Sequence, residues 1–508
     1  MNIIDSMKFR EYFRKDKKSI GIAGAFLLVA YGIKVFQIMF SHDTEAIISV
    51  PESLYESWLT MGRYGLVFIK KLLGIYTFNP YLASILMFLT MLGIVVVWGY
   101  LFYVLNEERY DSRVSWIFSV AFLTTPMMAE QISFLLQAFE VCLAILLLGI
   151  VLLMVWQAIL TEHHLWFLPS VILTVIVFSV YQTMVPLFIT GAAACFLIHY
   201  QNREKSWWPV LLKMVMVFCV GFLAYEIINK IIMTALGIST TSYISEQMVW
   251  GTVPFSEVAE NIVNHIWRSL SGQGFYYSAA FGIATVLALV YLVVRIKRKE
   301  KEYYLLVIAT VVFVMTPFLM TFLMGQEPKM RTQLGQGFVT GFYFQYGASG
   351  FLARSKKVSR FLSFSILALS LILGFQQSTK LADMFYTEYI QYQEDVNLAL
   401  KISNRIDMLD LGESPQEPVV FIGARSPKLN RSGIREMENL GHSFFEWSFT
   451  TGYGSFIMRN FMASLGYIYQ APSEEQIKTA EEVALNMGIW PASDSVQVTD
   501  GVIVVRLS

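Results

Sequence analysis

The residues best suited to do chemistry are two carboxylates close together in the segment 41–45 (SHDTE). Asp43 and Glu45 could act as a general base on a hydroxyl group, or could hold a divalent cation such as Mg²⁺ or Mn²⁺. Both follow directly on the first long apolar stretch, so we expect them at the depth of lipid head groups. The alternative is that the two acids simply end a helix in water.

Three cationic side chains lie in segments that we expect on the same side of the membrane as these acids: Arg63, Lys329 and Arg331. Arginine binds a phosphate through two parallel hydrogen bonds, and lysine binds it as a point charge. Acids and phosphate-binding groups together indicate group transfer to or from an anionic lipid head group. Lys329 and Arg331 could alternatively be loop charges in water.

Further polar side chains lie at or inside apolar segments, where ionisable groups are costly and often functional. Those expected on the same side as the acids are His42, Glu130, Gln131, Glu140, Tyr181 and Gln182. Lys34 and Lys230 could instead extend to the membrane surface, because a long side chain can bury its stem and keep its charge in water. Glu140 cannot extend as far, which favours a functional interpretation for it.

Motifs of several other functions are missing from the sequence. It contains no GxxxxGK[ST] phosphate loop, no HExxH and no GxSxG, so ATP-driven transport and the corresponding hydrolases are not indicated. Its three cysteines all lie in apolar runs, which excludes a disulfide scaffold and a cysteine zinc site. The six histidines are scattered and predict no metal centre.

The composition indicates a membrane protein. Of the 508 residues, 55% are hydrophobic and 15% are charged, whereas an ordinary soluble protein carries about 25% charged residues. The 38 basic and 38 acidic residues give zero net charge, so the basic excess of a nucleic-acid-binding protein is missing. We therefore expect a multi-pass protein in a lipid bilayer, with no nucleic-acid partner.

Eleven segments are long and apolar enough to be considered membrane spans, each of which needs roughly 20 apolar residues. They are 19–40, 80–105, 114–129, 134–160, 165–181, 184–200, 208–236, 276–294, 303–324, 333–352 and 360–376. If the N-terminus is cytoplasmic, the inside segments hold 19 Lys and Arg residues and the outside loops hold 6. Because basic residues favour the cytoplasmic side, this predicts a cytoplasmic N-terminus and an outer C-terminus.

Residues 377–508 differ in kind from the apolar part, 1–376. They hold 17 acidic and 10 basic residues, and their pattern predicts a helix over 381–409, a strand at 418–423, and helices near 454–465 and 473–488. Asp500-Gly501 predicts a hairpin turn between two final strands. We expect a small soluble α/β domain on the outer face, beside the outer loops 41–79 and 237–275.

The order of these features resembles a known family, the integral-membrane glucosyltransferases of the type II kind that modify O-antigen, within the GT-C class. A basic N-terminus and one span precede an acidic outer loop, and a small outer domain closes the chain. Between them lie the matching motifs, which are 42–45 (HDTE), 62–64 (GRY), Pro126 with Glu130, Tyr181-Gln182, and Arg331 at the opening of a late span.

The resemblance implies a GT-C-like, α-helical membrane glycosyltransferase in a bacterial plasma membrane. Its donor would be a hexose such as glucose linked to a polyprenyl phosphate, and its acceptor a surface polysaccharide or the lipid-linked precursor. In this class an acid of the first outer loop is the base of an inverting displacement, a role that maps to Asp43 or Glu45. Arg63 and Arg331 would bind the donor phosphate, and Glu130, Gln131 and Gln182 would line the sugar or acceptor pocket.

Two non-glycosyltransferase alternatives remain open from the sequence. The first is a transporter or flippase for lipid-linked sugars, which would place polar groups through the bilayer midplane and often carries inverted repeats. The second is an assembly scaffold whose outer domain binds wall polymer. Substitution of Asp43 and Glu45 distinguishes them, because only the enzyme needs these acids for sugar transfer.

Overall fold

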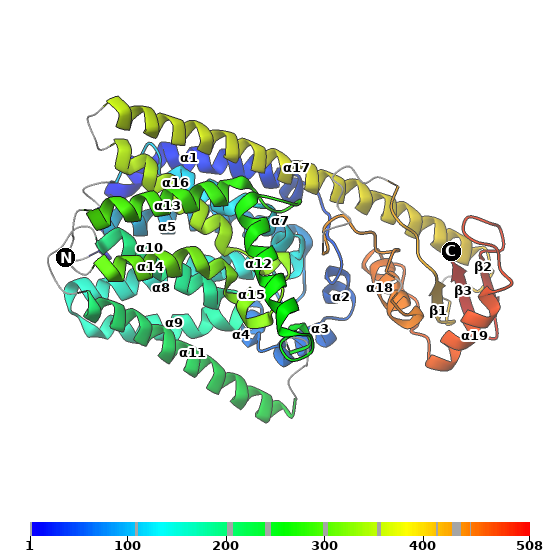
Figure 1. The fold of residues 1–508 in the computed structure, drawn as a ribbon. Coiled ribbons are helices and arrows are strands. Elements are labelled where there is room, and N and C mark those ends of the chain that lie inside the picture. The colour runs from blue at the N-terminus through cyan, green and yellow to red at the C-terminus, as the bar shows by residue number, and fades with distance from the viewer. Residues whose placement is uncertain are drawn as a thin grey trace.

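The computed structural model describes residues 3–106, 110–200, 207–238, 245–297, 303–352, 357–412, 415–428, 438–447 and 449–508. Within these residues, six helices are long and apolar enough to cross a membrane, and three shorter apolar helices accompany them. The helices lie side by side in one bundle, with a sheet-containing part beyond one end (Figure 1). A helical protein with several apolar helices is therefore confirmed, whereas the count of eleven spans and their sidedness stay predictions. Parts of the expected cytoplasmic loops, at 107–109, 201–206, 298–302 and 353–356, lie outside the described residues.

Most bundle helices follow the expected spans to within a few residues, but the first begins at Ser6 rather than at 19 and the ninth ends at Met315 rather than at 324. They are α1 (Ser6–Phe36), α5 (Pro80–Leu105), α8 (Leu135–Thr161), α9 (Phe167–Val180), α10 (Met184–His199), α11 (Trp208–Leu236), α13 (Ala279–Lys297), α14 (Tyr303–Met315) and α16 (Gly335–Leu352). The connections contain the short helices α2 (Thr44–Ser49), α3 (Pro51–Thr60), α4 (Tyr64–Leu72) and α15 (Leu319–Met324), and one longer helix, α12 (Phe255–Ser271). α4 falls where residues 63–73 favour an interfacial helix, and α15 lies inside the expected span 303–324, whereas α2, α3 and α12 were not predicted.

The expected third span, 114–129, is two helices in the structure. α6 (Trp116–Leu123) stops before Pro126, and α7 (Pro126–Ser133) begins at it. Proline lacks the N–H that an interior helical position must donate, but it suits the first turn of a helix. The Thr125 side chain caps α7 by accepting the Met128 N–H. Glu130, expected in a loop, consequently lies on a helix.

One continuous helix, α17 (Lys357–Asp407), replaces the expected eleventh span and the separate helix over 381–409. Its 51 residues correspond to roughly 75 Å at 1.5 Å per residue. It runs beside α1 along the bundle and continues to the C-terminal part, which contains the three strands (Figure 1). The two parts of the chain are thus joined by a helix rather than by a flexible linker.

The C-terminal part contains a three-stranded sheet in the order β1-β3-β2, formed by β1 (Val419–Ile422), β2 (Val496–Thr499) and β3 (Val502–Arg506). β1 is parallel to β3, and β2 and β3 form an antiparallel hairpin. Asp500 and Gly501 both have positive φ, as a type I′ hairpin turn requires. Helices α18 (Thr451–Ser464) and α19 (Glu474–Ala484) accompany the sheet, and α19 begins with a capping box from Ser473 and Gln476. These elements confirm the strands and helices predicted for residues 418–506.

Close packing of α16 on α6 depends on two glycines in a GxxxG spacing, Gly337 and Gly341. A Cβ atom at Gly341 would lie 2.6 Å from the Phe118 carbonyl oxygen, and one at Gly337 would lie 3.1 Å from the Ala121 carbonyl oxygen. Small residues allow such an approach of two backbones in a membrane protein. The break between α6 and α7 is thereby held against the bundle.

Two fully buried ion pairs connect distant helices. Lys34 Nζ of α1 lies 2.6 Å from Glu388 Oε1 of α17, and Lys70 Nζ of α4 lies 2.7 Å from Glu140 Oε1 of α8. Lys34 therefore does not extend to the membrane surface, and Glu140 faces a lysine rather than an open pocket. Each charge needs its partner, since an unpaired buried charge is strongly destabilising.

We predict that Lys34→Met destabilises the protein by about 3–5 kcal/mol, because it leaves the Glu388 carboxylate buried without a partner. The double variant Lys34→Met with Glu388→Leu should recover most of this loss. Unfolding by SDS in mixed micelles measures both, with Lys18→Met, an exposed lysine of the same helix, as the control. If Lys34→Met and Lys18→Met unfold at the same SDS fraction, the pair does not hold α1 to α17.

Candidate functional site

The acidic first loop forms a compact cluster around His42. The His42 Nδ1 atom lies 3.3 Å from Glu45 Oε1, and its Nε2 atom lies 3.3 Å from Asp43 Oδ1. Nε2 also lies 3.2 Å from the Tyr453 hydroxyl of α18, and the imidazole ring stacks on Trp447 at a centroid distance of 4.7 Å. The predicted acids and His42 therefore meet, together with two aromatic residues of the C-terminal part.

The two acids differ sharply in accessibility. The Asp43 side chain is 43% exposed, whereas the Glu45 side chain is 1% exposed. Asp43 has φ +73°, a left-handed conformation that is uncommon for residues other than glycine and tolerated by aspartate. It immediately precedes α2, while Glu45 lies in the first turn of that helix. Only Asp43 thus presents its carboxylate to a molecule from outside.

The protonation of the cluster follows from its burial and charge. Burial alone would lower the pKa of His42, but the carboxylates of Glu45 and Asp43 outweigh it and raise this pKa from 6.5 to about 9. Burial raises the pKa of the Glu45 carboxyl, and His42 opposes that rise. At neutral pH the ring is consequently an imidazolium between the two carboxylates.

The arrangement does not fit a divalent cation held by both acids. The His42 ring occupies the space between Asp43 and Glu45, where such a cation would need to lie. Among the residues that the structure describes, no three His, Cys, Asp or Glu side chains form a metal-binding group.

Glu130 connects this cluster to the rest of the chain. Its side chain is fully buried, with Oε1 accepting the Asn439 backbone N–H at 2.8 Å and Oε2 accepting the Tyr276 hydroxyl at 2.8 Å. The Asn439 side chain in turn donates to Ser41 Oγ at 3.0 Å, next to His42. The structure therefore gives Glu130 a position in which it holds a C-terminal segment against the first loop.

Arg331 lies between the acidic cluster and the start of α8. Its guanidinium group is 3.2 Å from Glu438 Oε1 and lies over the Phe134 ring at 4.1 Å. Its positive charge acts on both His42 and Glu130 and lowers the pKa of each. Lys329, two residues earlier, has an exposed side chain instead.

Arg63, which directly precedes α4, contacts the start of α8, as Arg331 does. Its guanidinium donates to Gln137 and Gln182, each at 3.3 Å, and lies over the Tyr181 ring at 4.8 Å. Gln137 follows Phe134 by three positions at the start of α8, and residues three apart on a helix are neighbours. Arg63 and Arg331 therefore contact adjacent positions of this helix end.

Buried polar atoms without partners lie among the predicted pocket residues. Both side-chain amide atoms of Gln131 and the Tyr181 hydroxyl are buried and have no hydrogen-bond partner among the described residues. Such atoms are uncommon in folded proteins and require an explanation. A bound ligand would supply the missing partners.

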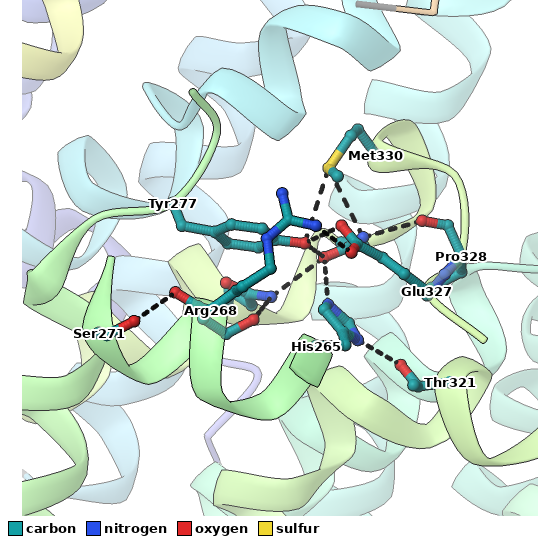
Figure 2. A network of polar contacts seen from close by, with 11 residues as sticks. His265, Arg268, Ser271, Tyr277, Thr321, Glu327, Pro328 and Met330 are labelled. Carbon is teal, nitrogen blue, oxygen red and sulfur yellow. Dashed lines mark hydrogen bonds and ion pairs between the residues drawn. The ribbon is translucent and has the colours of Figure 1, made fainter. Parts of the chain in front are cut away.

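A second polar network, shown in Figure 2, fixes the segment that carries Lys329 and Arg331. At its start, Glu327 accepts hydrogen bonds from Arg268 and Tyr277. At its end, Gln333 Oε1 lies 3.0 Å from His265 Nε2 and accepts the Tyr277 hydroxyl at 3.1 Å. Burial lowers the pKa of His265, so its ring is neutral near pH 7. Both ends of the segment are thus fixed to α12 and Tyr277.

Residues 32–353 match the sequence profile of a family described as "Glucosyl transferase GtrII". The chain belongs to the glucosyl transferase GtrII family. The matched region includes the first loop, Arg63, Glu130 and Arg331, so the expected resemblance and the glycosyltransferase class are confirmed. The transporter alternative gains no support from this family.

Two further comparisons add little to the family match. No curated protein matches the chain. Among solved structures, it is similar to an Archaeoglobus fulgidus oligosaccharyltransferase tethered to an acceptor peptide, with 14% identity and a TM-score of 0.39. That similarity covers 74% of this chain and 56% of the other, so the chain spans little more than half the length of that protein.

Several site residues of this GtrII-family protein escaped the sequence analysis. They are Gln137 on α8 and four residues of the C-terminal part, Glu438, Asn439, Trp447 and Tyr453. No motif marks them, because each meets its partner across a long stretch of sequence. Gln137 contacts Arg63 across 74 positions, whereas Asn439 and Tyr453 contact the first loop across 398 and 411 positions. The residue types alone, an acid and aromatic rings in a predicted outer domain, were the available signal.

We predict that His42 makes the stability of this GtrII-family protein depend on pH. Because the folded-state pKa of about 9 exceeds the ordinary value of 6.5, the stabilisation is fully present below pH 6.5 and is lost as pH rises through 9. The His42→Gln variant lacks this pH-dependent stabilisation. The unfolding temperature of the purified protein should therefore exceed that of His42→Gln clearly at pH 6 and only slightly at pH 10. An equal difference at both pH values would contradict a charged His42.

Proposed function

We propose that the chain transfers a hexose such as glucose from a polyprenyl-phosphate donor to a surface polysaccharide or its lipid-linked precursor. The transfer would take place on the outer side of a bacterial plasma membrane. The observation that carries the proposal is that an accessible acid, Asp43, lies 3.3 Å from His42, and that the charge of Arg331 acts on the same ring and lowers its pKa. A base and a phosphate-binding cation are the two groups that this reaction needs.

Asp43, rather than Glu45, is the base in this proposal. A general base must reach the proton that it removes, and the Asp43 side chain is 43% exposed while Glu45 is buried against His42. Glu45 then acts as a positioning residue, because it holds the imidazolium that orients the Asp43 carboxylate.

The reaction is an inverting displacement at the anomeric carbon of the sugar. Asp43 takes the proton of an acceptor hydroxyl as its oxygen attacks this carbon from the side opposite the phosphate. The bond between the anomeric carbon and the phosphate oxygen breaks, and its electron pair leaves with the polyprenyl phosphate. Arg331 stabilises the negative charge that develops on this leaving group, as preorganised cations do at transferring phosphates.

The donor phosphate is expected near the outer end of α8, where Arg63 and Arg331 contact neighbouring positions. A phosphate there could bind Arg331 in two-point fashion, with Lys329 adding charge from the exposed side. The unpartnered Gln131 and Tyr181 atoms, and Gln182 beside Arg63, are available to sugar hydroxyl groups. A lipid donor would keep its phosphate at head-group depth, which agrees with acids placed directly after α1.

We predict that Asp43→Asn lowers sugar transfer by about 10²–10⁴-fold, the usual contribution of a general base. Glu45→Gln should lower it much less, because Glu45 acts only through His42. Transfer of radiolabelled glucose from a prenyl-phosphate glucose donor by membranes or purified protein measures this. Glu56→Gln, an exposed acid in the same outer loop, is the control. A larger loss in Glu45→Gln than in Asp43→Asn would assign the base to Glu45.

We also predict that Arg331→Ala raises the KM for the donor at least tenfold while the unfolding temperature changes little. The loss reflects one charge-assisted contact to phosphate. Lys329→Ala should have a smaller effect because its side chain is exposed, and Lys401→Ala, on an exposed part of α17, should have none. An unchanged donor KM in a folded Arg331→Ala protein would remove Arg331 from the phosphate site.

A further inference from the structure

A cavity of about 500 Å³ opens on the far side of the segment that carries Arg331. α12 forms one wall, and Gln273, Gln326 and Glu327 form the rest. This volume is within the range of ligand pockets, about 300–1,000 Å³. The reaction proposed above does not use this cavity.

The charges in the cavity wall are already paired. Arg268 Nη1 donates to Glu327 Oε2 at 2.8 Å, and Glu327 also accepts the Tyr277 hydroxyl. The imidazole ring of His265, which also lines the cavity, contacts Thr321 and Gln333. The positive charge of Arg268 and the negative charge of Glu327 cancel, so the wall carries no net charge and favours a ligand without net charge.

The groups left for a ligand are carboxamides and one indole ring. The side chains of Asn261, Asn264 and Gln273 make no hydrogen bond to other described residues, and each amide offers two donors and one acceptor. Trp267, next to them, is 61% exposed. Amides that pair with hydroxyl groups, beside an aromatic face that packs on apolar ring carbons, suit a sugar.

The wall is rigid, as a binding site requires. The network of Figure 2 connects α12 through His265 to Thr321 and Gln333, and through Arg268 to Glu327. Two of the lining residues of α12, His265 and Arg268, therefore fix this helix in place through their own hydrogen bonds. Because this helix is already ordered, binding of a ligand would cost little conformational entropy.

The cavity wall and the proposed reaction centre are linked through two consecutive tyrosines. Tyr277 donates to Glu327 in the cavity wall, and the preceding residue, Tyr276, donates to Glu130 in the reaction centre. Glu327 is also four residues before Arg331 on the fixed segment. A chain of several sugars could hence contact both places.

We infer that this cavity binds uncharged sugar residues of the acceptor glycan away from the hydroxyl that reacts. The inference rests on the proposed function, because it makes the cavity an acceptor subsite of that reaction. It assigns Asn261, Asn264, Gln273 and Trp267 to recognition of the acceptor and no chemical step to any of them.

Binding of neutral oligosaccharides of one to six hexoses to the full-length protein in nanodiscs, measured by saturation-transfer NMR and titration, tests the inference. Asn261→Ala with Asn264→Ala should weaken the best binder about tenfold, through the loss of two hydrogen bonds. Trp267→Ala should abolish the saturation-transfer signal from the apolar ring protons of the sugar. Asn404→Ala, an exposed asparagine on α17, should bind like the wild type.

The same titration in Asp43→Asn separates this inference from the proposed function. Binding retained in Asp43→Asn and lost in the cavity variants supports the subsite even if no sugar transfer is found in the wild type. Equal affinity of wild type and cavity variants for every oligosaccharide would overturn the inference and leave the proposed reaction intact. Displacement of the bound oligosaccharide by a short prenyl phosphate would also overturn it, because the cavity would then be a donor site.

Discussion

The buried carboxylate of Glu130 is the interaction on which the rest of the candidate site depends. It accepts hydrogen bonds from the Asn439 backbone and the Tyr276 hydroxyl, each at 2.8 Å, and thus joins three segments that are far apart in sequence. A buried carboxylate is costly unless it is hydrogen-bonded, so its two partners are held firmly. Because Asn439 also contacts Ser41, this side chain joins the packing of α18 on α2 in holding the C-terminal part against the first loop, where Trp447 and Tyr453 meet His42.

This docking explains why two acids two positions apart have different surroundings. His42 is held between Trp447, Tyr453 and Glu45, and its positive charge keeps Glu45 engaged in the interior. Asp43, in a left-handed conformation at the entrance to α2, is left facing outward. In the proposed reaction, the acid that receives a proton and the acid that holds the ring come from one short segment, and the difference between them comes from the protein around it.

The sequence predicted local features well and long-range ones poorly. The apolar periods located most bundle helices, and Asp500-Gly501 and Ser473 with Gln476 fixed a hairpin and a helix start, because those signals are contained in a few neighbouring residues. The pairing of Glu140 with Lys70 and of Lys34 with Glu388 could not be foreseen, since each depends on which helices pack together. Pro126 marked the break of the third span, but its effect was not recognised there. The contribution of Trp447, Glu438 and Asn439 to the site could not be predicted, because it arises only when the C-terminal part packs against the first loop.

The central claim is that donor phosphate and acceptor meet between Arg331 and Asp43 on the outer face. A cryo-electron microscopy structure of the protein in nanodiscs, with a non-hydrolysable prenyl-phosphonate glucose bound, tests it most directly. The account predicts a phosphonate within hydrogen-bond distance of Arg331, with the anomeric carbon of the sugar facing Asp43. A phosphonate bound at the opposite end of the helix bundle, or in the cavity beside α12, would contradict it.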